Sequence, residues 1–387
     1  MTIELTKLEP EEERGRILTT GQMVRFTATL LSNVIGVVAM NGESYYPPPT
    51  AGNHDRSMVF PFEVSFAWVH IVLVLCCLPV YVAMVRFLHD PPRCVEHSAR
   101  ETSKSGTLFI LWDTMKTKVM LYLIVFSIGS IALAALSNPA SNIIANIAQP
   151  STLQSSVGGA FGSLLFIAGV WVFRKYFMNS NWRFTFVWTS LLVLLNMGFQ
   201  LLVIYNAWGV GQDGWFYAFG SNILSLISGV AQVLSSLVIA EMAPPGLEAT
   251  VYELLNTMHN AAGALNVNIQ NLFIPVFDLH GINSLTYFPS EKNPDPPQAE
   301  YNTRMMKATV FTILVSIAAT FFFVVFFPKS KAQTRRWRED ARWHKPWVGW
   351  AGIVIAVSCF VFSTTTSFLS LFPSTMCLPI AGGSGCN

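Results

Sequence analysis

The residues best suited to chemistry lie in one stretch, GLEATVYELLNTMHNAAGAL, at positions 246–265. It follows a Pro-Pro pair and enters a hydrophobic segment, yet it carries four polar or ionisable side chains, Glu253, Asn256, His259 and Asn260. At helical spacing, Glu253, Asn256, Asn260 and Gly263 fall on one stripe. Because a charged group in mid-membrane costs roughly 2.5–3.5 kcal/mol, such a polar face is expected to look into a helix bundle or a water-filled cavity.

This polar face has two interpretations. In the first, it lines a solute or proton pathway, with Glu253 as the candidate proton carrier and the other polar side chains as the lining. In the second, it is a seam of interhelical hydrogen bonds that only packs helices. Glu241 lies at the inner end of the preceding hydrophobic segment, just before Pro244. We expect Glu241 to be a charge partner at a cytoplasmic gate.

The composition identifies the class of protein that must position these residues. Of the 387 residues, 52% are hydrophobic and 12% are charged, whereas a soluble domain has about 25% charged residues. A folded chain of this size needs a solvated surface, so one soluble core cannot hide that excess. The sequence predicts an all-α, polytopic membrane protein.

Apolar runs long enough to cross a bilayer give the number of spans. About nine transmembrane helices are predicted, at residues 20–40, 62–87, 119–138, 157–177, 184–205, 215–241, 251–277, 307–327 and 347–371. The first of these contains Arg25 in its early turns, and an arginine near a helix end can snorkel to the interface.

The distribution of positive charge gives an orientation. With the N-terminus placed inside and nine spans, only four of the 24 Lys and Arg residues fall on the outer side, namely Arg56, Lys292, Arg304 and Lys307. Cytoplasmic loops carry an excess of Lys and Arg. The predicted topology is therefore cytoplasmic at the N-terminus and extracytoplasmic at the C-terminus.

The segments outside the spans fit this topology. We expect a cytoplasmic N-terminal segment at 1–19, a basic cytoplasmic loop at 88–118, a basic, Trp-rich cytoplasmic segment at 328–346 and an extracytoplasmic tail at 372–387. The 328–346 segment has an interfacial composition that faces anionic lipid, and we expect no nucleic-acid partner. Cys377 and Cys386 could pair if the tail is extracytoplasmic.

Other polar and small residues within the spans leave alternatives open. Gly158, Gly162 and Gly169 are spaced for close packing of helix backbones, with a hinge as the alternative. Amides at Asn196, Gln200, Asn222 and Gln232 are interhelical hydrogen-bond partners or ligand contacts. The amides near the end of the 119–138 span, beginning with Asn138, are a cavity mouth or ordinary loop residues.

The sequence gives no positive sign of an enzyme. GVGQDG at 209–214 matches G-x-G-x-x-G in form, but it lies in a turn between two spans and lacks the strand and helix that the motif needs. A Walker A sequence, H-E-x-x-H and G-x-S-x-G do not occur. We therefore expect no catalytic residues, cofactor or metal.

Residues 244–263 carry a resemblance. Their pattern P-x-G-x-E-A-T-x-[FY]-x-L, followed by N-x-x-G, resembles the folate–biopterin transporter family of the major facilitator superfamily. The matching positions are Pro244, Gly246, Glu248, Ala249, Thr250, Tyr252, Leu254, Asn260 and Gly263. The Glu-Arg-Gly-Arg stretch before residue 20 looks like the start of that family's fifth helix.

The resemblance implies a major-facilitator-type helical bundle. Residues 119–327 would form one complete six-helix lobe, and 20–87 would be a two-helix remnant of the first lobe, with about four N-terminal helices lacking. Residues 347–371 would be an extra transmembrane helix. Alternating access needs two lobes around a midplane site.

The resemblance also implies a function. This is secondary-active transport of a folate, pterin or related small organic solute, with proton coupling as a further expectation. The alternative is a truncated or non-transporting membrane scaffold whose polar helix face only packs helices. We expect the lipid bilayer and a small organic solute as partners and favour the plasma membrane over an internal membrane. The oligomeric state and the identity of the solute stay open.

Overall fold

The computed structural model describes residues 15–43, 59–87, 104–243, 248–282, 287, 297–381 and 383. Throughout these residues the regular structure is helical. The α-helices are α2 (Arg16–Ala39), α3 (Phe66–Phe87), α4 (Lys104–Met115), α5 (Lys118–Gly129), α6 (Ser141–Ala148), α7 (Thr152–Val172), α8 (Trp182–Ile204), α9 (Gly214–Asn222), α10 (Ser225–Met242), α11 (Glu248–Val276), α13 (Gln298–Phe323), α14 (Lys331–Glu339) and α15 (Pro346–Leu369).

Each of the nine predicted spans coincides with helix. Within the described residues, seven helical segments are long and apolar enough to cross a membrane, and an eighth forms if the bent pair of α4 and α5 is one span. α11 is not among them, although its 29 residues are ample for a span. Its amides and Glu253 lower its hydropathy. The structure confirms the polytopic helical class.

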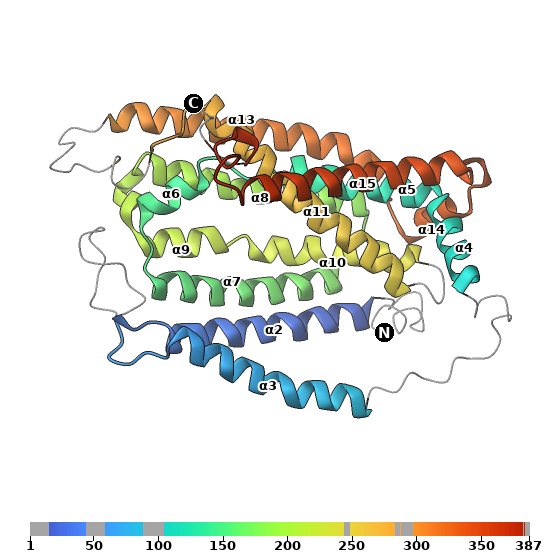
Figure 1. Cartoon of the computed structure of the whole chain (residues 1–387), viewed down its shortest axis with the longest axis horizontal. Helices are drawn as coiled ribbons and strands as arrows, with labels where there is room; N and C mark the ends of the chain where they lie inside the picture. Colours follow the sequence, from blue (N-terminus) through green and yellow to red (C-terminus); the bar gives the residue numbers. More distant parts are fainter. Residues whose placement is uncertain are drawn as a thin grey trace.

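The spans lie side by side along the long axis of the molecule (Figure 1). α2 and α3 form one side of the bundle, and α13 and α15 lie toward the opposite side. α7 packs against α2, α9 and α10, and α11 packs against α5 and α15. α3 is almost entirely exposed, which gives it the character of a helix facing lipid.

The buried centre lies where α5, α7, α10 and α11 meet. Its main cluster includes Val119, Ile124, Val170, Leu234 and Val251, all at most 1% exposed. A second cluster joins α6 to the ends of α8 and α13. These two clusters hold the helices that border the cavity described below.

Close backbone contacts confirm the packing role of the glycines on α7. A Cβ added at Gly169 would lie 1.9 Å from the carbonyl oxygen of Leu226 on α10, and one at Gly158 would lie 2.7 Å from that of Ala218 on α9. Any larger residue would therefore force these helices apart. Close approach of this kind is what small residues permit in membrane helices.

Three predicted segments contain breaks. α4 and α5 meet at an angle of 69°, so the second half of the predicted 88–118 loop is helical. α5 continues as a π-helix over Ser130–Ala134, and the chain leaves helical geometry after Ala134, before the end of the predicted 119–138 span. The predicted span 215–241 is divided into α9 and α10.

The ends of the bundle differ in chemistry. The end that carries α14 and the first turns of α5, α8 and α15 is rich in Lys, Arg and Trp, and we call it the basic end. The sequence predicts it to be cytoplasmic. Cys377 lies beyond the far end of α15 and is disulfide-bonded, and its partner is outside the described residues. Disulfides persist in oxidising compartments, which agrees with an extracytoplasmic tail.

Candidate functional site

A cavity of about 390 Å³ lies among α5, α8, α10 and α11. Small-molecule sites have volumes of about 300–1,000 Å³ and combine an apolar lining with a few polar groups. The polar lining consists of Ser127, Ser130, Thr189, Ser190, Ser228, Gln232, Ser235, Ser236, Tyr252, Asn256 and His259. The cavity is thus the right size and chemistry for a small organic solute.

α11 contributes three polar side chains to the cavity. Tyr252, Asn256 and His259 follow one another at helical spacing and share a face. Across the cavity, α10 contributes Gln232, and Ser228 and Ser235 lie one turn to either side of it. An imidazole and two amides supply both hydrogen-bond donors and acceptors, so the lining can pair with the edge of a polar heterocycle.

Three phenylalanines border the cavity toward the basic end. The ring centroid of Phe126 lies 4.8 Å from that of Phe186 and 4.4 Å from that of Phe327. Arg183 fixes the backbone here, because its Nε donates to the carbonyl of Phe327 at 2.6 Å and a terminal nitrogen donates to that of Val325 at 2.8 Å. The aromatic cluster closes this side of the cavity and offers a flat surface for stacking.

On the side of the cavity away from the three phenylalanines, Asn266 stabilises the wall by hydrogen bonds to the backbone. In the π-helical turn, the amide of Ala135 donates to Ser130 instead of Ile131, which releases the carbonyl of Ile131. The side-chain nitrogen of Asn266 donates to the carbonyls of Ile131 and Ala135 at 2.7 and 2.8 Å, and its oxygen accepts from the amide of Ser137 at 3.2 Å. Because Ile131 and Ala135 line the cavity, this buried amide shapes it.

α14 packs across the basic end. The side chain of Glu241, which is 2% exposed, pairs with Arg335 of α14 at 3.4 Å. Trp337 of α14 stacks edge-to-face on Tyr122 of α5, at 5.2 Å between centroids. Glu241 thus pairs with a basic residue at the end of the bundle, as expected for a gate charge, although a gating role stays a proposal.

The other sequence-predicted residues occupy different positions. Glu253 and Asn260 are exposed and do not line the cavity, and a Cβ at Gly263 would meet nothing within 4 Å. Thr250 is also exposed. Pro244 and Gly246 lie outside the described residues, and Glu248 begins α11 with no description of its side chain. The structure therefore brings Asn256, His259 and Tyr252 to the cavity, and not the rest of the predicted stripe.

The Ser and Thr residues of α8 and α10 were missed by sequence reasoning. They are small polar residues, one or two together, in apolar runs, and such residues usually bond to their own helix, as Thr189 does to the carbonyl of Thr185 at 2.8 Å. The one residue of this lining on α10 that the sequence did single out as a candidate ligand contact is Gln232. Gln200, by contrast, accepts from Asn138 at 2.7 Å, so this amide is an interhelical partner.

Comparison with known proteins gives the class. The model of the BT1 family matches residues 26–282, and the chain belongs to this family. It is similar to a protein of Synechocystis sp. named "Folate-biopterin transporter", with 26% identity over 108 residues, which cover 27% of this chain and 22% of that relative. No solved structure matches. The resemblance drawn from the motif is confirmed, and the chain is a multi-pass membrane protein of a transporter family.

Proposed function

We propose that this chain carries a folate, a pterin or a related small organic solute across a membrane by secondary-active transport. The observation that supports this best is the cavity, because its lining combines amides and an imidazole with a cluster of aromatic rings. That combination suits a flat heterocycle with donors and acceptors on its edge. The similarity to the Synechocystis transporter agrees with this choice of solute.

His259 is our candidate for proton coupling. Among the described residues that line the cavity it is the side chain whose ordinary pKa lies near neutral pH. Glu253, the carrier expected from the sequence, is exposed, as His259 is, but does not line the cavity. A proton that is coupled to solute transport must be carried by a residue close to the solute site. Substitution of His259 and substitution of Glu253 are therefore expected to have different effects on uptake. We further propose a cytoplasmic N-terminus, based on the charge distribution. We also propose the plasma membrane as the location.

The test is uptake of radiolabelled folate, and of labelled biopterin, into proteoliposomes that contain the purified chain and an imposed pH gradient. His259→Gln and Gln232→Leu should reduce uptake, because the first removes the titratable imidazole and the second removes an amide from the cavity. Glu253→Gln and Asn260→Ala, on the exposed face of the same helix, should leave uptake unchanged. Loss of uptake in Glu253→Gln with normal uptake in His259→Gln would reverse the assignment of the proton carrier.

The alternative is a non-transporting membrane scaffold. Its supporting observation is that α3 buries almost nothing, so the two-helix segment does not close a second lobe over the cavity within the described residues. Under this alternative, wild-type proteoliposomes show no uptake, and added folate neither quenches tryptophan fluorescence nor raises the melting temperature. Either ligand response without uptake would place binding, and not transport, in this chain.

A further inference from the structure

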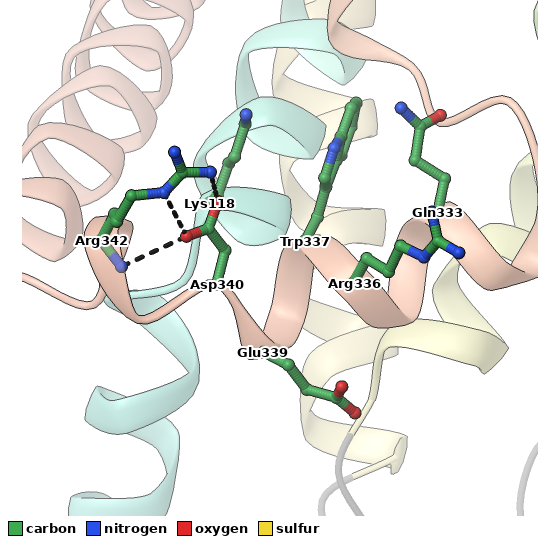
Figure 2. A pocket seen from close by; sticks show the side chains of 7 residues that line it. All are labelled: Lys118, Gln333, Arg336, Trp337, Glu339, Asp340 and Arg342. Carbon is green, nitrogen blue, oxygen red and sulfur yellow. Dashed lines mark hydrogen bonds and ion pairs between the residues drawn. The ribbon is translucent and has the colours of Figure 1, made fainter.

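A second pocket, distinct from the transport cavity, lies at the basic end of the bundle. It has a volume of about 470 Å³ and is lined by Lys118 of α5 and by Gln333, Arg336, Trp337, Glu339, Asp340 and Arg342 of α14 and the segment that follows it. Figure 2 shows these side chains around the ring of Trp337. The transport function proposed above makes no use of this pocket.

The charges around the pocket are only partly compensated. Asp340 is occupied by Arg342, with Oδ1 accepting from Nε at 3.0 Å and Oδ2 from a terminal nitrogen at 3.1 Å. Arg336 is exposed and makes no ion pair with any described residue. The ammonium of Lys118 lies 5.3 Å from the centroid of the Trp337 ring, and its charge also acts on Asp340. Glu339 also lines the pocket, and its carboxylate points away from the Trp337 ring (Figure 2).

Gln333 adds a neutral donor. Its Oε1 accepts from the backbone amide of Lys329 at 2.6 Å, which fixes the orientation of the side-chain amide. The NH₂ group therefore points toward the Trp337 side of the pocket (Figure 2). Gln333 and Arg336 thus present donors on one side of the Trp337 ring, and Lys118 lies on its other side (Figure 2). An arginine with a nearby amide donor matches the oxygens of a phosphate group.

The position of the pocket relative to the bilayer indicates which kind of phosphate group could reach it. The chain re-enters the hydrophobic layer at Pro346, directly after the pocket residues. Trp347 and Trp350 in the first turns of α15 are 54% and 59% exposed, and exposed tryptophans mark the headgroup level of a bilayer. Basic pockets between membrane helices at this level bind anionic lipid headgroups.

We propose that this pocket binds the phosphorylated headgroup of an anionic phospholipid, held by Arg336 and Gln333. Because α14 also pairs with Glu241 through Arg335, the bound lipid fastens α14 to the basic end of the bundle. The inference is independent of the solute that the chain transports.

The test uses the purified full chain in detergent, with lipid binding measured by native mass spectrometry. The probes are a short-chain phosphatidylinositol bisphosphate, phosphatidylcholine and soluble inositol trisphosphate. Arg336→Gln should weaken binding of the anionic lipid about fivefold, as expected for one basic contact at an anionic surface. Arg338→Gln is the matched control, because it makes the same charge change on α14 outside the pocket, and it should change binding less than twofold.

Three results would overturn the proposal. Equal weakening by Arg336→Gln and Arg338→Gln would show a diffuse attraction and no pocket. Soluble inositol trisphosphate binding as tightly as the lipid would show a site for free phosphates. Equal binding of phosphatidylcholine and the anionic lipid would show that charge plays no part. Both variants should keep the lipid-free melting temperature of the wild type, since the side chain of Arg336 is exposed and that of Arg338 makes no ion pair with described residues.

Discussion

Replacing Asn266 by alanine should destabilise the cavity wall. Asn266 is 5% exposed and makes three hydrogen bonds to backbone groups of Ile131, Ala135 and Ser137. Side-chain hydrogen bonds within membrane proteins contribute about 0.6 kcal/mol each on average and up to about 1.7. Three such bonds therefore give about 2 kcal/mol, with an upper value near 5 kcal/mol. Because Asn266 is buried, alanine leaves the two carbonyls and the amide without this partner, and we expect a cost at or above the lower value.

The assay is the melting temperature of the purified chain, followed by size-exclusion chromatography after heating. In a chain of 387 residues, a loss of about 2–5 kcal/mol corresponds to roughly 2.5–6 °C. Asn260→Ala is the control, because Asn260 is an exposed amide on the same helix, and it should shift the melting temperature by less than about 1 °C. If Asn266→Ala melted within about 1 °C of Asn260→Ala, the three hydrogen bonds would not hold the π-helical turn, and the reasoning would fail.

Three further predictions follow from the structure. Gly169→Val should prevent normal folding, because its Cβ would lie 1.9 Å from the Leu226 carbonyl, whereas Gly198→Val, with nothing within 4 Å, should express and melt normally. The hydrogen bonds from Arg342 hold the pKa of Asp340 below its ordinary value, so this contribution to stability is present above about pH 4 and is lost as pH falls through the lowered pKa. Accordingly, the melting-temperature difference between wild type and Asp340→Asn should be constant from pH 5 to 8 and shrink only below about pH 4, and a difference that disappears near pH 6 would contradict the pairing. A single cysteine at Arg338 should react with a membrane-impermeant maleimide only from the cytoplasmic side, and labelling from outside whole cells would reverse the predicted topology.

The positions of the spans could be predicted from the sequence, because an apolar run of sufficient length has few alternatives to a membrane helix. The bends could not. The π-helical turn depends on Asn266, which in the sequence is one of several amides in α11, and spacing alone does not show which amide reaches a backbone carbonyl of another helix. The break between α4 and α5 likewise depends on Thr117, whose side chain accepts from the amide of Met120 and starts α5 afresh.

The sequence predicted that α11 has a polar face toward a cavity. The residues that line the cavity, however, belong to the stripe next to the predicted one. Helical periodicity groups Glu253 with Asn256 and Asn260, and it groups Tyr252 with Asn256 and His259 equally well. The choice between these stripes depends on where α8 and α10 pack. Asn256 belongs to both groups, and this explains why it is the amide that the sequence and the structure both place in the candidate site.

Along its length, α11 combines the two interpretations that the sequence left open. Toward the basic end, Asn256 and His259 line the cavity. Further along, Asn268 donates to Thr366 of α15, and Gln270 donates to the carbonyl of Asn138 at 3.1 Å, so this part is a seam of interhelical hydrogen bonds. The seam fixes the helix at one end, and a helix fixed in this way can present unsatisfied polar groups to a cavity at the other without rotating toward lipid. Polar packing in one half of α11 is therefore a physical condition for a polar cavity in the other half.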